Sequence, residues 1–463
     1  MKLSTLLGGI GFPDQKYSCD PEILRIVHDS RLVQQGDLFC CIPGLLYDGH
    51  EFASDAVKAG AAAVLAEKSL NIEVPLIETT SSRKSLALLS SFHAGNPSRD
   101  LEVVGVTGTN GKTSVVYLLQ QILRHAGQDV ESSGTLTGER TTPEAPDLQN
   151  RLSQWRDRGV DSVVMEVSSH ALSQHRVDGT EFSAVAFTNL SRDHLDYHES
   201  MEEYFKAKER LFEQSFSSRA VVVVGQEAGD RIANTSQKNG LEVVEVDVDS
   251  ASSMESWHGQ SLKIPFEAEF MAVNTLVAAE LALLLNVPPS KIALGVSQLQ
   301  AVPGRFEILK GESSPAIVID YAHTPEALKA TLESARALTE KGRVLVVFGC
   351  GGGRDQGKRP LMGQMADVGA DFSVVTSDNP RGESPMSIID EIVSGMSAGS
   401  HIVEEDRKEA IKTALMKSEP EDVIVVAGKG HETTQEIAGK FFDFDDKEIS
   451  KSLIFELFED EVY

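Results

Sequence analysis

The sequence has few cysteines, no long apolar segment and no excess of positive charge, and each absence excludes a class of protein. Four cysteines among 463 residues form no CxxC pair, so neither a disulfide framework nor a zinc-ribbon site is expected, and a reducing cytoplasm is favoured. No apolar run approaches the roughly 18 residues of a membrane-spanning helix, and no secretion-signal cleavage site follows the first residues. Seventy acidic residues against 43 basic ones give a net charge of −27, which disfavours nucleic-acid binding. We therefore expect a cytoplasmic protein with no membrane or nucleic-acid partner.

The order of apolar runs and chain breaks predicts an α/β protein of three domains. Residues 1–97 contain an extended run at 36–39 and an alanine-rich segment, expected to be helical, at 53–65. In residues 98–302 and again in 303–463, short apolar runs alternate with helical patterns, as in parallel sheets with helical crossovers. We expect a small N-terminal α/β domain, a central P-loop ATPase domain with a parallel sheet, and a C-terminal Rossmann-like domain.

A glycine-rich segment between an apolar run and a helical pattern has the features of a phosphate-binding loop. It spans residues 107–114 (TGTNGKTS) and departs from the general motif because Val106 occupies the place of the first glycine. In such a loop, backbone N–H groups receive phosphate oxygens, Lys112 spans the outer phosphates, and the Thr113 hydroxyl holds magnesium. We expect ATP or GTP to be bound by Gly108, Thr109, Asn110, Gly111, Lys112, Thr113 and Ser114.

Three further side chains are candidates for catalysis or metal binding. Glu166 closes an apolar run, at the edge of the sheet where parallel strands bind ligands. His194 follows another apolar run, and a neutral imidazole there is a candidate metal ligand. Lys208 is centred on the apolar stripe of a helix expected at 202–212, where burial would lower its pKa and leave an amine that reacts with carbon dioxide. Each residue also has an ordinary interpretation: a solvent-facing glutamate, a structural or solvated histidine, and a lysine that covers apolar surface while its charge reaches water.

In order along the chain, these motifs resemble the Mur ligase family. Three other segments contribute: 29–31 (DSR), 320–325 (DYAHTP) and 428–432 (GKGHE). The resemblance covers nearly the whole chain. It implies an ATP-dependent amide ligase of peptidoglycan precursor synthesis, acting through an acyl phosphate, with domains for a UDP-sugar, for ATP and for an incoming amino acid. We also expect a monomer.

The resemblance also assigns roles to individual residues. It implies a catalytic set of Lys112, Glu166, His194 and Lys208, and a magnesium set of Thr113, Glu166, His194 and a carbamylated Lys208. ATP would be contacted in addition by Asn274, Arg305 and His323. A UDP-muramoyl dipeptide would be contacted by Ser30, Thr141, Thr142, Ser168, Gln174 and Arg176.

The C-terminal part of the chain bears on the choice of amino acid. The segment 349–354 (GCGGGR) begins like a dinucleotide-binding fingerprint, but Arg354 stands in place of the third glycine, so NAD binding is not expected. The resemblance implies that the amino acid is held by Arg354, Asp378, Asn379, Pro380, Arg381, Gly428 and Glu432. The form of residues 378–381 (DNPR) resembles the members that add meso-diaminopimelate to UDP-N-acetylmuramoyl-L-alanyl-D-glutamate. The alternatives are a lysine-adding homologue, a folylpolyglutamate-type ligase, and a P-loop regulatory protein that only hydrolyses nucleotide.

Overall fold

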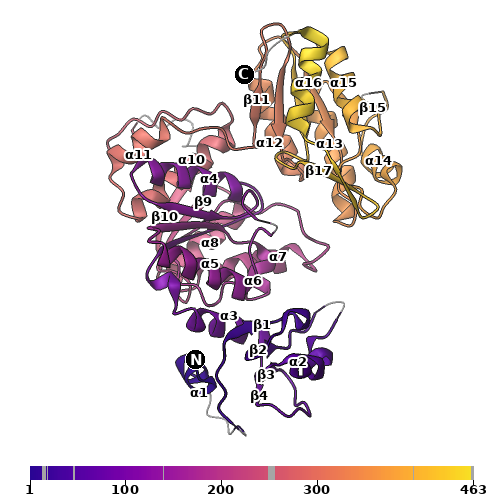
Figure 1. The fold of residues 1–463 in the computed structure, drawn as a ribbon. Coiled ribbons are helices and arrows are strands. Elements are labelled where there is room, and N and C mark those ends of the chain that lie inside the picture. Colours follow the sequence, from indigo (N-terminus) through magenta and orange to yellow (C-terminus); the bar gives the residue numbers. More distant parts are fainter. Residues whose placement is uncertain are drawn as a thin grey trace.

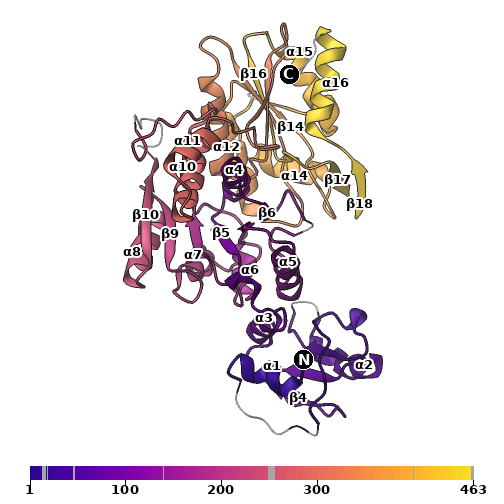
Figure 2. The same ribbon diagram turned by 60° about the vertical axis from the view of Figure 1, so that its left-hand side comes forward.

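The computed structural model describes residues 1–12, 17, 19–44, 47–138, 140–248, 256–399 and 401–459. Three sheet-containing domains follow one another along the chain, with the N-terminal domain at one end of the molecule, the central one in the middle and the C-terminal one at the other end (Figures 1 and 2). The predicted three-domain α/β class is confirmed. Within the described ranges, no helix is long and apolar enough to cross a membrane.

The N-terminal domain is a four-stranded parallel sheet with three helices. The strands lie in the order β1 (Arg25–Val27), β2 (Asp37–Cys40), β3 (Ala63–Ala66) and β4 (Leu76–Glu78), and the helices are α1 (Leu3–Gly9), α2 (Ala53–Ala59) and α3 (Ser82–His93). The helix predicted over 53–65 is wrong in its second half. Gly60 adopts a left-handed conformation, with φ of 114°, and caps α2, because glycine takes this conformation without steric cost. The chain then enters the buried strand β3.

The central domain carries a six-stranded parallel sheet whose four inner strands are mainly buried apolar runs, as expected for a sheet covered on both faces. The order is β10 (Glu242–Asp247), β9 (Arg219–Val224), β8 (Ala184–Phe187), β5 (Glu102–Thr107), β7 (Ser162–Glu166) and β6 (Val130–Ser133). Its helices are α4 (Lys112–His125), α5 (Ala145–Asp157), α6 (Ser169–Ser173), α7 (Met201–Glu209), α8 (Glu227–Lys238), α10 (Glu269–Leu284) and α11 (Pro289–Val296). The helix predicted at 202–212 is split into α7 and a short 3-10 turn, Arg210–Phe212.

The C-terminal domain has a six-stranded sheet in which only the first edge strand is antiparallel. The order is β11 (Glu307–Leu309), β12 (Ala316–Asp320), β16 (Val423–Ala427), β13 (Val344–Phe348), β14 (Phe372–Val375) and β15 (His401–Val403). Helices α15 (Arg407–Lys417) and α16 (Asp446–Phe458) cover one face. The other face is covered by α12 (Pro325–Ala337), α13 (Arg359–Gly369) and α14 (Pro385–Val393). A separate antiparallel hairpin, β17 (Thr434–Ile437) with β18 (Lys440–Asp443), follows β16.

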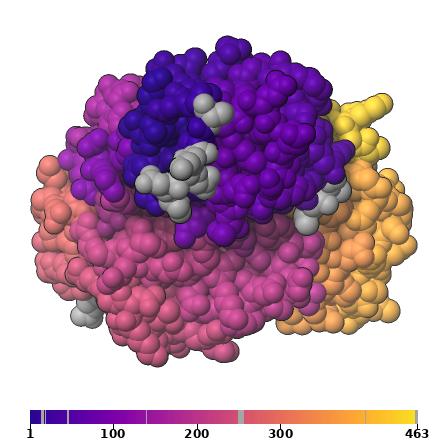
Figure 3. Space-filling model, turned by 90° about the horizontal axis from the view of Figure 1, so that it is seen from below, coloured from indigo at the N-terminus to yellow at the C-terminus, as the bar shows by residue number. Residues whose placement is uncertain are grey.

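The N-terminal domain meets the central domain where α3 packs on α5, whereas the central and C-terminal domains meet through loops. Viewed from the N-terminal end, the indigo N-terminal domain lies against the magenta central domain, and the orange C-terminal domain emerges on one side (Figure 3). Polar contacts cross from the central to the C-terminal domain, among them the hydrogen bond of Asn110 Nδ2 to Thr324 Oγ1, at 3.3 Å. The loops that carry the sequence motifs therefore face one another.

Candidate active site

The phosphate loop leaves β5 at the middle of the central sheet and runs into α4, as predicted. Gly108 has φ of 147° and Gly111 has φ of 87°. A Cβ atom at Gly108 would lie 1.9 Å from the Thr188 hydroxyl oxygen, and one at Gly111 would lie 2.6 Å from Asn274 Oδ1. Both positions therefore require glycine, which explains a loop built on Gly108 while Val106 stays in the buried strand.

Glu166 ends β7, the strand beside β5, and faces the start of α4. The Thr113 hydroxyl donates to Glu166 Oε1 at 3.1 Å. Thr135 donates to the same carboxylate twice, from its N–H to Oε1 at 2.7 Å and from its hydroxyl to Oε2 at 3.2 Å. Glu166 is 1% exposed, so the interpretation as a solvent-facing glutamate is wrong.

Lys112 folds back over the loop that precedes it. Its Nζ donates to the carbonyl oxygens of Gly108, at 2.8 Å, and Thr109, at 2.7 Å. Burial lowers the pKa of the ammonium, and the nearby carboxylates of Glu166 and Asp193 partly oppose that shift. The charge is thus held inside the loop, where a lysine of this motif meets the outer phosphates of a nucleotide.

Lys208 points inward from α7, as its place on the apolar stripe predicted. It is 1% exposed. Its Nζ donates to the Gly108 carbonyl at 2.7 Å and lies 4.4 Å from the ring centroid of Tyr204. Burial and the charge of Lys112 lower its pKa well below the ordinary value. The interpretation as a lysine that keeps its charge in water is therefore wrong, and a neutral amine next to the phosphate loop is favoured.

His194 lies in the loop after β8, and burial lowers its pKa to about 2. The imidazole is therefore neutral at physiological pH and able to bind a metal. Its Nε2 lies 3.5 Å from Asp193 Oδ2, and its ring meets the ring of His170 edge to face at 4.8 Å. Its backbone has φ of 55°, a conformation that non-glycine residues seldom adopt.

Whether this region fits magnesium depends on the oxygen atoms that it offers. Among the described residues, no group of three or more histidine, cysteine, aspartate and glutamate side chains could hold a metal. Thr113 and Glu166 place a hydroxyl and a carboxylate side by side, and magnesium prefers oxygen ligands. Carbamylation would give Lys208 two oxygens that share one negative charge. The residues thus fit a magnesium ion, with Lys208 as an oxygen ligand only after modification.

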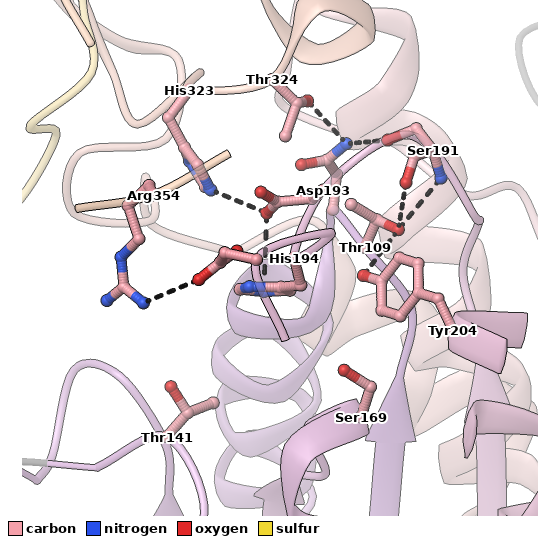
Figure 4. A network of polar contacts seen from close by, with 12 residues as sticks. Thr109, Thr141, Ser169, Ser191, Asp193, His194, Tyr204, His323, Thr324 and Arg354 are labelled. Atoms are coloured by element: carbon pink, nitrogen blue, oxygen red, sulfur yellow. Dashed lines mark hydrogen bonds and ion pairs between the residues drawn. The ribbon is translucent and has the colours of Figure 1, made fainter. Parts of the chain in front are cut away.

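The C-terminal domain reaches the same region from the opposite side. His323 Nε2 lies 3.4 Å from Asp193 Oδ2 (Figure 4), and Lys358 Nζ lies 3.3 Å from Asp193 Oδ1. Arg305 Nη2 lies 3.4 Å from the Thr113 hydroxyl. The structure therefore gathers the residues expected to bind ATP, Asn274 beside Gly111 included, around one phosphate loop.

Five of the six residues expected to bind the muramoyl dipeptide lie together in the central domain. The Thr142 hydroxyl donates to the Glu166 carbonyl at 2.9 Å and accepts the Ser168 N–H at 3.0 Å. Arg176 donates to the Thr142 carbonyl at 2.8 Å and to Gln174 Oε1 at 2.7 Å. Thr141 belongs to the same loop, and its hydroxyl lies 3.4 Å from that of Thr135.

The sixth residue, Ser30, lies in the N-terminal domain, in a 3-10 turn, Ser30–Leu32. No hydrogen bond among the described residues joins it to the other five. A dipeptide carrying a long nucleotide-sugar head would have to bridge the two domains to meet all six residues.

Most residues expected to bind the amino acid form a second group, in the C-terminal domain. Asn379 Nδ2 donates to Glu432 Oε2 at 2.8 Å. Gly428, with φ of 117°, passes so close to Asp378 that a Cβ atom would lie 2.8 Å from Asp378 Oδ2. Pro380 links Asn379 to Arg381 within the same loop. Arg354 is directed elsewhere, since its Nη1 lies 3.8 Å from Asp196 Oδ2 of the central domain (Figure 4).

Comparison of the sequence and the structure with known proteins identifies the family of this chain. Residues 22–98 match a family model described as "Mur ligase family, catalytic domain", residues 106–285 match "Mur ligase middle domain", and residues 304–430 match "Mur ligase, glutamate ligase domain". A curated protein of Bacillus licheniformis, named UDP-N-acetylmuramoyl-L-alanyl-D-glutamate–2,6-diaminopimelate ligase, is 39% identical over 99% of this chain and 100% of its own length. The chain belongs to the Mur ligase family.

Two further relatives have the same name. One, from Listeria monocytogenes serotype 4b, is 39% identical over 96% of this Mur ligase and 97% of its own chain. The other is a solved structure with 30% identity and a TM-score of 0.66, covering 94% of this chain and 95% of that one. Family membership makes the chain an ATP-dependent ligase, so the interpretation as a P-loop regulatory protein is set aside.

The structure of this Mur ligase also brings in residues that the sequence had not singled out for a role. Lys358 reaches the central domain, and Lys429 lies fully buried beside Asp378 and Glu432. Tyr321 stacks under Arg305, with the guanidinium carbon 4.2 Å from the ring centroid. Lys429 follows Gly428 directly after the buried strand β16, a signal that could have marked it as part of a site at the sheet edge. Lys358 lies farther from its strand, in a 3-10 turn, Gln356–Lys358, and carries no such signal.

Proposed function

We propose that this Mur ligase joins meso-diaminopimelate to UDP-N-acetylmuramoyl-L-alanyl-D-glutamate and converts ATP to ADP and phosphate. The observation that carries the proposal is that Arg381, which pairs with Glu436, follows Asp378 in the loop whose Asn379 donates to Glu432. A guanidinium and several carboxylates in one group suit an amino acid with a second carboxylate and two ammonium groups. The names of the full-length relatives support the same reaction.

The reaction needs an activated carboxylate, because a carboxylate is itself a poor acyl donor. The glutamyl carboxylate of the dipeptide would attack the γ-phosphorus of ATP, which gives an acyl phosphate and ADP. Lys112 would stabilise the charge that moves during this transfer. The amine of the amino acid would then attack the acyl carbon and expel phosphate. The contacts of Asp193 with His323 and Lys358 hold the two domains together, so that amine and acyl phosphate can meet away from water.

The remaining assignments belong to the same proposal. ATP is bound by residues 108–114 with Asn274, Arg305 and His323, and the dipeptide by Ser30, Thr141, Thr142, Ser168, Gln174 and Arg176. Thr113, Glu166, His194 and a carbamylated Lys208 would hold magnesium, which would supply Lewis-acid stabilisation of the transferred phosphoryl group. Residues 1–97 serve the UDP-sugar, 98–302 serve ATP and 303–463 serve the amino acid. We place the enzyme in the cytoplasm as a monomer.

The proposal is tested by measuring phosphate release from ATP while each of the other substrates is left out in turn. We expect sustained release only when both the muramoyl dipeptide and diaminopimelate are present. Hydrolysis at the same rate without either substrate would contradict a ligase and favour a nucleotide switch. Sustained release with the dipeptide and glutamate, but not diaminopimelate, would contradict the choice of amino acid.

A further inference from the structure

Lys429 is a fully buried lysine at the base of the amino-acid group in the C-terminal domain. Its side chain is 0% exposed. The Nζ donates to the Thr434 carbonyl at 2.6 Å, to Glu432 Oε2 at 3.1 Å and to Asn379 Oδ1 at 3.2 Å. All three of its protons are therefore used, and burying a lysine is tolerated only with such pairing.

These contacts fix the orientation of Asn379. Its Oδ1 accepts from Lys429 Nζ and from the Glu436 N–H, the latter at 2.9 Å. Its Nδ2 then donates to Glu432 Oε2 at 2.8 Å. A flipped amide would place two donors against Lys429, so the lysine determines which end of Asn379 faces Glu432.

The same contacts divide the nearby carboxylates into occupied and available oxygens. Glu432 Oε2 accepts from both Asn379 and Lys429. Glu432 Oε1 has only a distant contact with the Tyr321 hydroxyl, at 3.5 Å. Asp378 Oδ1 is buried and has no hydrogen bond among the described residues, although Lys429 Nζ lies 3.8 Å away. A buried acceptor of this kind calls for a donor.

We propose that Lys429 is a positioning residue for the incoming amino acid, which directs Glu432 Oε1 and Asp378 Oδ1 toward a substrate ammonium group. One lysine against two carboxylates leaves a net charge of −1, which a single ammonium neutralises. The inference rests on the proposed function and deepens it. Lys429 itself makes no contact with substrate, because its three protons are already used.

The proposal separates two steps of the reaction. Acyl phosphate formation needs ATP and the dipeptide but not the amino acid, so Lys429→Met should leave it unchanged within about threefold. In the ligation step, the KM for diaminopimelate should rise roughly 10-fold or more, because the carboxylate of Glu432 loses its buried and charged hydrogen-bond partner. Acyl phosphate is measured by trapping it with hydroxylamine as the hydroxamate, and ligation by steady-state kinetics of the full-length enzyme.

Lys412→Met provides the matched control. Lys412 lies on the outer helix α15 of the same domain and pairs with Glu456 at 2.8 Å, so its loss should change neither step. A general loss of C-terminal structure would remove Arg305 and His323 from the phosphate loop and would therefore abolish trapping as well. If Lys429→Met does not fold, Lys429→Gln, whose uncharged amide keeps two N–H donors, should show the same separation with a smaller rise in KM.

The outcomes distinguish this inference from the proposed function. If the wild-type enzyme fails to use diaminopimelate, the proposed function is wrong. If the wild-type enzyme uses it and the folded Lys429 variants keep a normal KM, or lose trapping and ligation equally, the positioning role is wrong. A selective rise in the KM for diaminopimelate, with trapping and the KM for ATP unchanged, supports it.

Discussion

Arg381 and Glu436 form an ion pair inside the amino-acid group, with Arg381 Nε 3.2 Å from Glu436 Oε2. Arg381 Nη1 also donates to the Gly352 carbonyl at 2.8 Å. Two backbone hydrogen bonds join Arg381 to Glu436 and Ala438 of the hairpin region and hold it at φ of 53°. Among the described residues, no hydrogen bond occupies Nη2. The Arg381 guanidinium is thus held through Nε and Nη1, and its Nη2 can still donate a hydrogen bond to a ligand.

Replacing Arg381 by alanine should raise the KM for diaminopimelate and narrow its advantage over lysine. Diaminopimelate carries a distal carboxylate that lysine lacks, and a guanidinium binds it through parallel donors. Glu436 keeps Arg381 paired when lysine is bound, and the side chain is 31% exposed. Loss of a buried charge pair costs about 2–5 kcal/mol, and we expect the low end of that range here. The preference for diaminopimelate over lysine, as a ratio of kcat/KM, should therefore fall by about 30-fold. The measurement is kcat/KM for both amino acids.

The control for Arg381 is Arg336→Ala, which removes an exposed pair with Asp371 in the same domain and should leave both values unchanged. A variant of Arg381 that keeps the full preference for diaminopimelate would show that another residue recognises the distal carboxylate.

Local patterns predicted the parts of this site that depend on neighbouring residues. The phosphate loop, the position of Glu166 at the end of β7 and the inward direction of Lys208 all follow from strand and helix periodicity over short segments. The prediction of one helix over residues 53–65 failed because composition alone does not show that Gly60 ends the helix and that a buried strand follows.

Contacts between domains could not be predicted in this way. The pairing of Lys358 with Asp193 joins residues 165 positions apart, and it depends on how two sheets dock. Within the C-terminal domain, the pairing of Arg381 with Glu436 depends on a short hairpin that is only partly buried and carries little periodic signal. Arg354 faces Asp196 for the same reason: its partner is set by the arrangement of the domains.

Lys112→Ala should lower kcat by several orders of magnitude without unfolding the protein. Stabilisation of a transferring phosphoryl group is worth on the order of 3 kcal/mol or more per charged contact. Turnover and thermal unfolding are measured on the same preparation. The control is Lys291→Ala, because Lys291 lies in α11 and is exposed. ATP-dependent product formation by Lys112→Ala at the wild-type rate would show that the phosphate loop does not take part in the reaction.

Lys208→Ala should abolish nearly all activity while Lys206→Ala, on the exposed face of the same helix, should not. The lowered pKa of Lys208 leaves a neutral amine that can take up carbon dioxide. Labelled bicarbonate should therefore give a carbamate signal in the wild type that is missing from the variant. Added bicarbonate should not rescue the variant, whereas a short carboxylic acid should do so in part. Near-normal turnover of Lys208→Ala would contradict the assignment.

Lys358→Met should loosen the docking of the C-terminal domain and lower kcat at least 10-fold. Both partners of the Lys358 and Asp193 pair are 7% exposed, and removing one member of a buried pair costs about 3–5 kcal/mol. Solution scattering should show a more extended molecule. Lys447→Met breaks a pair with Glu307 inside the C-terminal domain and should change neither quantity. Unchanged scattering and turnover in Lys358→Met would show that this pair does not hold the domains together.

Competition between two amino acids tests the central claim most directly. The enzyme is given ATP, magnesium, UDP-N-acetylmuramoyl-L-alanyl-D-glutamate and equal amounts of meso-diaminopimelate and lysine, and the products are identified by mass. We expect the diaminopimelate-containing product to exceed the lysine-containing one by about 30-fold, which corresponds to about 2 kcal/mol for the charge pair between Arg381 and the distal carboxylate. A lysine-containing product in excess, or no amide product from either amino acid, would contradict the account.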